Sequence, residues 1–376
     1  MSIKILCTGD MQLDKSFGTL GKSATFFRNQ LFETWKRIMK DAKEYDVVLV
    51  AGDLFDREGT PLGVIEKAAD VLAACPTKTV VLAGNHDSLK SGIPSVLRTA
   101  LEQRGANHVI VPLERKPLSF PEMGITVYPV PLASKGDISN LHDWIPPRNG
   151  DEGIRLALLH GAIEELPKGR IPSNLAEAKD LDLVVCGDQH GPTKGDENDS
   201  NLFSIEMSKH RRLVYAMAPE ALDINQGFVG SYTRVVMDSS GIVEEMKRIQ
   251  IGELRFLNTT VKVEPNVDPK AAIEEAMSSV LDRPAEKTCI RLRLEGEVSS
   301  DVKVALEQEL ARLKTIWPLL EILNTISIIQ DEKQTVRGDD DPLLSVLRVK
   351  AEEQRLAPDV LKRAIAIYQL NKGRWI

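Results

Sequence analysis

The chain has 376 residues, of which 42% are hydrophobic and 27% are charged, and its formal net charge is −7. This length suggests about two or three domains, and the composition is that of a globular protein rather than a disordered one. The negative charge argues against a protein that coats nucleic acid with its whole surface, although a local basic groove is compatible with it.

Neither a membrane span nor a signal peptide is expected. Apolar runs stay shorter than the roughly 18 residues that span a bilayer, and the N-terminal sequence MSIKILCTGD becomes polar too early for a secretory signal. The four cysteines stand apart in apolar surroundings without C-x-x-C spacing, which predicts core residues rather than a zinc ribbon or disulfides. We therefore expect a cytoplasmic protein.

Short apolar runs that give way to polar or glycine-rich sequence predict strands in the first half of the chain. Helical spacing follows the first run, where Leu31, Trp35 and Ile38 repeat about every 3.6 residues, and residues 62–72 show the same pattern. Apolar strands that alternate with helices predict a buried sheet with helices on both faces. The predicted strands are 3–8, 46–51, 78–83, 154–159 and 182–186.

The second half of the chain has a different organisation. Residues 201–249 predict strands without intervening helices, which would complete a second sheet of the same domain, residues 1–252. Residues 253–330 predict a small α+β domain, with a helix that begins at Asp268 and Pro269. The charged segment 331–341 predicts a linker. Residues 342–376 predict a hairpin of two amphipathic helices, which must pack on the body or on a partner.

Every one of these early predicted strands is followed by acidic, amide or imidazole side chains. In isolation, each motif is explained equally well by a polar turn after a strand. Together they place Asp, Asn and His side chains at one sheet edge, where the carboxyl ends of the strands meet, and this predicts a metal site. The motifs are Gly9-Asp10-Met11-Gln12, Gly52-Asp53-Leu54-Phe55-Asp56-Arg57, Gly84-Asn85-His86-Asp87, His160-Gly161 and Gly187-Asp188-Gln189-His190.

These oxygen and nitrogen ligands, without thiolates, suit Mn²⁺, with Mg²⁺ or Fe²⁺ as alternatives. Asp53 is central among the strands, so its carboxylate is the natural bridge between two ions that generate a hydroxide nucleophile. His86 would then be free to donate a proton to the leaving oxygen. The alternative for His86 is a hydrogen-bonded turn histidine.

The order and spacing of GD-x-Q, GDLFDR, GNHD, His160-Gly161 and GDQH resemble the calcineurin-like metallophosphoesterases, and within them the SbcD-type DNA repair nucleases. The resemblance covers residues 1 to about 250. It implies a four-layer α/β/β/α sandwich with a smaller α+β DNA-capping domain. By resemblance, the C-terminal helices are similar to the segment that binds an SMC-like, SbcC-type ATPase, and a homodimer is expected.

The resemblance also implies a ligand set. Asp10, Gln12, Asp53 and His190 would surround one ion, and Asp53, Asn85, His160 and Asp188 would surround the other. The family usually has histidine at positions 12 and 188. Asp188 can still bind a metal and favours a harder ion, whereas Gln12 is at best a weak ligand. Because both replacements remain polar, we favour an active enzyme over a degenerate scaffold.

Further residues receive supporting roles. Asp56, Arg57 and Asp87 are expected to lie around the ligands. Arg57 would pair with acids near the metals, and Asp87 would orient His86. The remaining histidines, His108, His142 and His210, are interpreted as structural. Two basic groups could contact DNA, although a solvated surface explains each as well: Lys15, Lys22 and Arg28, and then Lys209, Arg211 and Arg212.

The leading hypothesis is a Mn²⁺-dependent phosphodiesterase that cuts DNA, as an endonuclease or exonuclease, in repair or defence. One alternative is a small-molecule or nucleotide phosphoesterase on the same fold, because a fold does not set its substrate. The other is a non-catalytic subunit that tethers DNA or the ATPase, which only Gln12 and Asp188 favour.

Overall fold

The computed structural model describes residues 2–137, 142–150, 153–163, 171–191, 204–208, 211–265, 267–328, 346–347, 349–350 and 358–371. The chain forms two compact units. The first comprises Met1–Thr259, Met277–Leu292 and Lys314–Glu321, and the second comprises Thr260–Ala276, Arg293–Leu313 and Ile322–Ile376. The first unit therefore continues past residue 252, where the sequence predicts a domain boundary, and it takes in two later segments.

One six-stranded sheet of the first unit has the order β12-β11-β1-β2-β3-β4. Its strands are β1 (Ile3–Thr8), β2 (Val47–Val50), β3 (Lys78–Val81), β4 (Val109–Ile110), β11 (Ser231–Met237) and β12 (Val243–Gln250). The strands β1 to β4 are parallel, whereas β11 is antiparallel to β1. The prediction that residues 231–249 belong to the second sheet is wrong, because β11 pairs with β1 and places Val235 opposite Ile5.

The other six-stranded sheet has the order β5-β6-β7-β8-β10-β9. Parallel pairs join its four central strands, and both edge strands are antiparallel to their neighbours. The motifs at His160 and Asp188 thus follow strands of this sheet and not of the sheet that contains β1. The strands are β5 (Leu118–Phe120), β6 (Ile125–Pro129), β7 (Ile154–His160), β8 (Leu183–Gly187), β9 (Ser204–Ser208) and β10 (Arg211–Tyr215).

The two sheets pack face to face and explain why their strands are apolar throughout. Side chains such as Leu49 of β2, Val80 of β3 and Leu158 of β7 form one buried cluster between the sheets. The opposite side chains of β2, Val48 and Val50, contact the helical layer instead. A central strand is therefore buried on both faces, which its uninterrupted β-branched and leucine sequence supplies.

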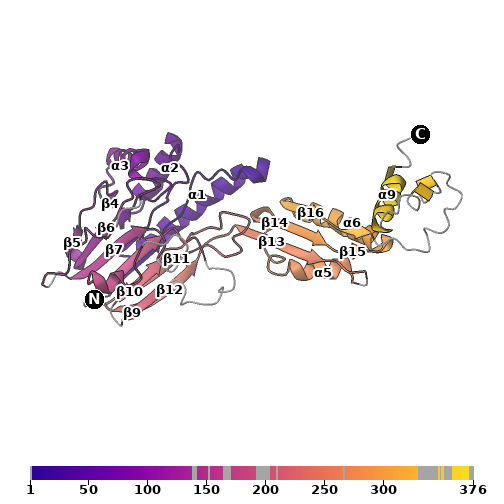
Figure 1. The fold of residues 1–376 in the computed structure, drawn as a ribbon. Helices are drawn as coiled ribbons and strands as arrows, with labels where there is room; N and C mark the ends of the chain where they lie inside the picture. Colours follow the sequence, from indigo (N-terminus) through magenta and orange to yellow (C-terminus); the bar gives the residue numbers. More distant parts are fainter. Residues whose placement is uncertain are drawn as a thin grey trace. The chain divides into compact units, whose positions relative to one another are not determined.

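Helices cover the outer face of the first sheet. Helices α1 (Ala24–Asp41), α2 (Leu62–Ala73) and α3 (Ile93–Gln103) lie on one side of it (Figure 1). Trp35 and Ile38 of α1 are fully buried there, as their helical spacing predicts. The short helix α4 (Leu175–Ala178) packs on the outer face of the second sheet. The layer order is therefore α, β, β, α, as the resemblance implies.

Short 3-10 segments and the cysteines complete the description of the core. The 3-10 segments are η1 (Gly18–Ser23), η2 (Ala42–Glu44), η3 (Leu89–Ser91), η4 (Pro121–Met123) and η6 (Ala285–Lys287). All four cysteines are buried and free, which confirms that they are core residues.

Strands and helices of the α+β pattern occupy the region after residue 252. Strands β13 (Arg255–Lys262), β14 (Thr288–Glu295) and β16 (Leu320–Asn324) form a three-stranded sheet, and β15 (Glu297–Val298) pairs with β17 (Ser327–Ile328). Within the second unit, helices α5 (Pro269–Ala276) and α6 (Ser300–Ile316) bury Ile273, Leu306 and Leu310. The elements match the predicted pattern, and a capping role stays a prediction.

The C-terminal prediction is described only in part. Helix α9 (Pro358–Asn371) coincides with the second predicted helix of the hairpin. The predicted linker 331–341 lies outside the described residues, as does most of the first helix of the hairpin. Over the ranges that the structure describes, no helix combines the length and apolar character needed to cross a membrane.

A buried carboxylate fastens the end of the first sheet to α1. Glu220 is fully buried and accepts hydrogen bonds from the Thr34 hydroxyl and from the backbone N–H groups of Glu253 and Leu254. Burial raises the pKa of Glu220 from 4.5 to about 7, although these donors and Arg37 oppose the rise. The folded protein therefore binds this proton more tightly than the unfolded chain does.

This raised pKa predicts a pH-dependent stability. The contribution of Glu220 to the free energy of unfolding is fully present below pH 4.5 and is lost as the pH rises through about 7. The loss amounts to about 3 kcal/mol. Urea unfolding at pH 5 and pH 8 measures it by the difference between wild type and Glu220→Gln, whose amide does not titrate. The unfolding free energies of the two proteins should change differently between pH 5 and pH 8. The same change in both would exclude Glu220 as the source of the pH dependence.

Candidate metal centre

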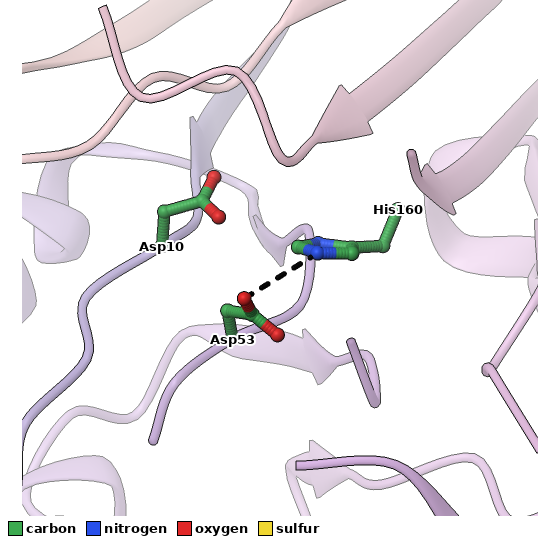
Figure 2. Close-up of side chains that lie close together, drawn as sticks. All are labelled: Asp10, Asp53 and His160. Atoms are coloured by element: carbon green, nitrogen blue, oxygen red, sulfur yellow. Dashed lines mark ion pairs between the residues drawn. The ribbon is translucent and has the colours of Figure 1, made fainter. Parts of the chain in front are cut away.

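Three side chains from both sheets meet at the carboxyl ends of their strands. Asp10 follows β1, Asp53 follows β2, and His160 is the last residue of β7. One ligand atom from each of the three lies within 4.8 Å of the others, and all three residues are buried. Figure 2 shows the two carboxylates and the imidazole turned toward a common point, with His160 Nε2 3.5 Å from Asp53 Oδ2.

Three further predicted ligands lie around this group. Asp188 Oδ1 is 3.8 Å from His160 Nε2 and 3.5 Å from the Asn85 amide nitrogen. The backbone N–H of Asp188 donates to Asp10 Oδ2 at 3.0 Å. His190 Nε2 lies 3.5 Å from Asp10 Oδ1. The structure thus brings together six of the seven predicted ligands, all except Gln12, but it draws them from two sheets rather than from one edge of one sheet.

The unsatisfied atoms of this cluster fit a divalent cation. Asp10 Oδ1, Asn85 Oδ1 and His160 Nε2 are buried, and each is without a hydrogen-bond partner among the described residues. Leaving such an atom unpaired costs about 1–3 kcal/mol. His160 Nδ1 contacts the Ala51 carbonyl at 2.7 Å, so Nδ1 carries a proton, and Nε2 faces the acids, where an ion can replace its proton and bind its lone pair. Carboxylate, amide and imidazole lone pairs are the ligands that Mn²⁺ accepts.

The electrostatics of the cluster also favour added positive charge. Burial, together with the charges of Asp53 and Asp188, raises the pKa of Asp10 well above its usual value. Burial would raise the pKa of Asp53 as well, but His160 and the His86 N–H outweigh it and lower that pKa. Burial alone would lower the pKa of His160, yet Asp53 and the other acids raise it far above its usual value. Clustered carboxylates of this kind are stabilised by a cation, whether a proton or a metal ion.

The backbone holds three of these acids in an uncommon conformation. Asp10, Asp53 and Asp188 have positive φ angles of 50°, 51° and 83°, in the left-handed region that non-glycine residues seldom occupy. Each such residue costs about 1–3 kcal/mol and persists where the surrounding structure demands it. The fold therefore gives up stability at these positions to turn the carboxylates inward.

Glycines beside the ligands allow the close approach. A Cβ atom on Gly84 would lie 2.2 Å from Asp53 Oδ1, and one on Gly187 would lie 1.9 Å from the Ala51 carbonyl oxygen. Gly52 has a φ of +88°, and its Cβ would meet His160 Nδ1 at 2.4 Å. These contacts explain why glycine precedes the ligands here, because a larger residue would separate the ends of the two sheets at Gly52 and Gly187 and the ends of β2 and β3 at Gly84.

Gln12 is held by a lysine. Its amide oxygen accepts a hydrogen bond from Lys15 Nζ at 2.9 Å, and the same ammonium lies 3.1 Å from Asp56 Oδ1. The amide nitrogen of Gln12 faces His190 Nε2 at 3.4 Å. The oxygen that could serve as a ligand is thus occupied by Lys15. The sequence treats Lys15 as a candidate DNA contact, whereas the structure gives it this positioning role.

Gln226 contacts the other nitrogen of His190, a contact that the sequence motifs do not reveal. The backbone N–H of Leu222 donates to Gln226 Oε1 at 2.7 Å, which leaves the Gln226 NH₂ to donate to His190 Nδ1 at 3.0 Å. Gln226 thus favours the neutral form of His190 with the proton on Nε2, facing Asp10, whereas the Gln12 amide nitrogen, 3.4 Å from Nε2, favours the other form. Binding of an ion through Nε2 requires the proton on Nδ1 instead. Gln226 therefore biases His190 against the form that binds an ion through Nε2.

Replacing Gln226 by Glu should strengthen metal binding at His190. Both carboxylate oxygens would accept, one from Leu222 N–H and one from a protonated Nδ1, so that Nε2 gains a free lone pair. Mn²⁺ affinity measured by titration calorimetry should rise about 10-fold, and it should fall in Gln226→Leu. Asn225→Asp is the control for added charge, because Asn225 contacts Asp223 and Asn258. Imidazole ¹⁵N shifts that show the same tautomer in wild type and Gln226→Glu would refute this role.

His86 is placed at the open side of the centre. Its backbone N–H donates to Asp53 Oδ1 at 2.9 Å, its Nε2 lies 4.0 Å from Asp53 Oδ2, and its side chain is 30% exposed. The Asp56 carbonyl contacts Nδ1 and so orients the ring. This position allows the ring to reach a bound substrate without being a ligand.

The prediction that Asp87 orients His86 does not agree with the observed hydrogen bonds. Asp87 is buried, and its carboxylate accepts from the N–H groups of Gly84, at 2.7 Å, and Phe55, at 3.1 Å. Asp87 thereby joins the loops after β2 and β3, and burial followed by the charge of Asp53 raises its pKa to about 7. The side chain closes a turn because both of its oxygens meet backbone donors.

Arg57 acts through an acid outside the sequence motifs. Its Nε donates to Asp14 Oδ2 at 2.8 Å, and Asp14 Oδ1 accepts from the N–H of Asp56 at 2.7 Å. Asp14 is buried, so this pair fastens the loop after β2 to the loop after β1. The sequence offered no signal for Asp14 beyond its place two residues after Gln12.

The candidate DNA contacts are scattered. Lys22 is exposed, and Arg28 donates to the Ser16 carbonyl and the Thr25 hydroxyl. Lys209 lies outside the described residues, and the side chain of Arg211 is likewise not described. Arg212 lies on β10, where its backbone pairs with Leu183. DNA contact by these residues stays a prediction.

Comparison with known proteins identifies the family. A calcineurin-like phosphoesterase family model matches residues 3–192. TT1561 of Thermus thermophilus is 12% identical, with 67% of this chain and 100% of that chain covered and a TM-score of 0.38. An archaeal phosphodiesterase is 11% identical, with 66% and 99% covered and a TM-score of 0.33. No curated protein matches the chain. The matched region contains Asp10, Asp53 and His160, and the chain belongs to the calcineurin-like phosphoesterase family.

Proposed function

We propose that this protein is a Mn²⁺-dependent phosphodiesterase that cuts DNA, as an SbcD-type nuclease does. The observation that carries the proposal is the set of buried atoms without partners at Asp10, Asn85 and His160, which lie where both sheets end. Two bound divalent ions would supply a hydroxide nucleophile and offset the negative charge of the phosphate. Asp53 lies between the two halves of the ligand set and is the proposed bridge.

Residues of the chain would perform the remaining chemistry. Attack of hydroxide on phosphorus breaks the bond to the leaving oxygen, which needs a proton. His86, partly exposed and oriented by the Asp56 carbonyl, is placed to donate it. Asp188 adds a carboxylate where the family usually has a neutral imidazole, which favours a hard ion such as Mn²⁺ or Mg²⁺.

Two features favour a polymeric substrate over a nucleotide. The chain continues beyond the phosphoesterase fold into the α+β elements of the second unit, which hydrolysis of a small molecule does not require. The centre also remains accessible, with the side chains of His86 and His190 30% and 25% exposed. A nucleotide phosphoesterase is the second candidate, because the same fold serves both substrates.

The test compares substrates and metals on the purified full chain. Labelled single- and double-stranded DNA and an activated nitrophenyl diester are incubated with Mn²⁺, Mg²⁺ or chelator. The proposal expects both DNA and the diester to be cut with Mn²⁺ and neither with chelator. Hydrolysis of the diester without DNA cutting would favour the nucleotide phosphoesterase, and binding of DNA without any hydrolysis would favour the non-catalytic tether.

The proposal includes an SMC-like ATPase as partner of the C-terminal helices. On α9, the residues Val360 and Ile367 are 45% and 63% exposed, which suits a partner surface. Val360→Asp should weaken capture of a co-expressed SbcC-type ATPase, and undiminished capture would count against this surface.

The proposed homodimer is tested separately by sedimentation of the full chain.

A further inference from the structure

A groove of about 690 Å³ opens directly beside the metal centre. Asp188 and His190 line one part of it, and Arg255, Asn258 and Arg283 line another. All the lining residues belong to the first unit. The groove therefore leads from the proposed ligands to two guanidinium groups that the sequence motifs do not include.

Arg255 is held in place but is incompletely satisfied. Its Nη1 donates to the carbonyl oxygens of Gly252, at 3.1 Å, and Leu254, at 2.8 Å. Its Nε is buried and has no hydrogen-bond partner among the described residues. The carbonyls fix the position of the guanidinium through Nη1 alone, and a planar guanidinium of this kind matches a phosphate.

Arg283 adds a second positive charge to the same groove. Its Nε lies 3.4 Å from Asp282 Oδ1, in a pair whose side chains are 42% and 76% exposed, and pairs this exposed contribute little. Burial, and then the charge of Arg283, lowers the pKa of Arg255, so the two cations lie close enough to repel each other. An anion between them would relieve that repulsion.

Glu220, Glu253 and Asp282 offset the positive charge at Arg255 in part, but the first two are also engaged by other groups. Glu253 is engaged by Arg37 and Lys287, and Glu220 accepts hydrogen bonds from Thr34 and two backbone N–H groups. The rim is polar as well, since Asn258 donates to Asn225 Oδ1 at 2.9 Å and both residues line the groove. A polar channel with two cations suits a phosphodiester backbone better than an apolar ligand.

We propose that Arg255 and Arg283 form a phosphate-binding subsite, which holds a phosphate of the substrate chain next to the one that is cleaved. The inference rests on the proposed phosphodiesterase function and narrows its substrate to a polynucleotide with at least one phosphate beyond the scissile bond. A terminal phosphate of a nucleotide offers the same chemistry, and the substrates in the test separate these two sources.

The test uses the full chain with Arg255→Gln, Arg283→Gln and the double variant. Hydrolysis of a single-stranded oligonucleotide, of a dinucleotide with and without a terminal phosphate, and of an activated nitrophenyl diester is measured with Mn²⁺. Arg98→Gln is the matched control, because Arg98 pairs with Glu102 on the exposed face of α3. Arg283→Lys keeps the charge and should restore part of the loss.

The proposal expects kcat/KM for the oligonucleotide to fall about 10- to 100-fold, mainly through KM, with a much smaller change for the activated diester. The slope of log affinity against log salt should fall by about 0.7 for each phosphate that the variant no longer binds. A loss of activity that the variants show on the dinucleotide only when it carries a terminal phosphate would show that the subsite binds the terminal phosphate of a nucleotide. If Arg255→Gln unfolds, Arg283→Gln tests the subsite by itself, because Arg283 is at the more exposed position.

The outcomes separate the two proposals. Variants that match the wild type on the oligonucleotide, or that lose the same factor on all substrates, overturn the subsite and leave the nuclease function standing. A wild type that hydrolyses the activated diester but neither cuts nor binds the oligonucleotide overturns both.

Discussion

Asp53→Ala is expected to abolish hydrolysis, with a loss of about 10³-fold or more. The Asp53 carboxylate is buried between Asp10 and His160, accepts a hydrogen bond from the His86 N–H, and is the proposed bridge between the ions. Its removal should therefore release metal as well as activity. Asp188 also lies near the cluster, with Oδ1 3.8 Å from His160 Nε2, but the group in which all ligand atoms lie within 4.8 Å of one another contains Asp53 as the second carboxylate beside Asp10.

Metal binding gives the readout that is independent of activity. Saturating Mn²⁺ should raise the melting temperature of the wild type, since a ligand at 100 times its Kd stabilises the folded state by about 2.7 kcal/mol. Asp53→Ala and the isosteric Asp53→Asn should lose most of this rise. Asp70→Ala is the control, because Asp70 is an exposed acid that pairs with Arg104. Normal Mn²⁺ stoichiometry in Asp53→Ala would show that the bridge is misassigned.

His86→Ala should separate two substrates. Loss of a general acid lowers turnover by about 10²- to 10⁴-fold when the leaving group is an alkoxide that needs a proton, as in DNA. Nitrophenolate leaves without protonation, so hydrolysis of the activated diester should be much less affected. Metal binding should be retained, because the His86 ring meets the Asp56 carbonyl and is not among the clustered ligands.

The control for His86 is His108→Ala, since the His108 ring contacts the Leu72 carbonyl at 3.4 Å on the helical side of the sheet. Turnover of both substrates by this variant should match the wild type. Equal losses on DNA and on the activated diester in His86→Ala would remove His86 from proton transfer and leave it a role in binding.

The local part of this architecture could be predicted from the sequence. Strands such as β1 and β7 occur where apolar runs meet glycine, and the acids and histidines that follow them come together in space. Glycine before a ligand was a usable signal because the backbone reverses sharply there, with Asp10 and Asp53 left-handed. The residues that define the cluster could thus be predicted from motifs of only a few residues.

The non-local part could not be predicted. Pairing of β11 with β1 joins strands that are far apart in the sequence, such as Ile5 with Val235, and no local pattern encodes it. The same holds for Gln226, which reaches His190 across 36 positions, and for Arg255 beside Arg283. The role predicted for Asp87 rested on its place next to His86 in the sequence, whereas its carboxylate accepts from the backbone N–H groups of Gly84 and Phe55.

Asp10, Asp53, Asn85 and His160 are expected to hold divalent ions. Crystals of the full chain soaked in Mn²⁺ test it directly, because anomalous difference density locates manganese without reference to activity. Two peaks are expected, with Asp53 touching both and His160 Nε2 and Asn85 Oδ1 touching one of them. Peaks confined to other parts of the surface, or one peak that leaves Asp53 without a metal, would contradict it.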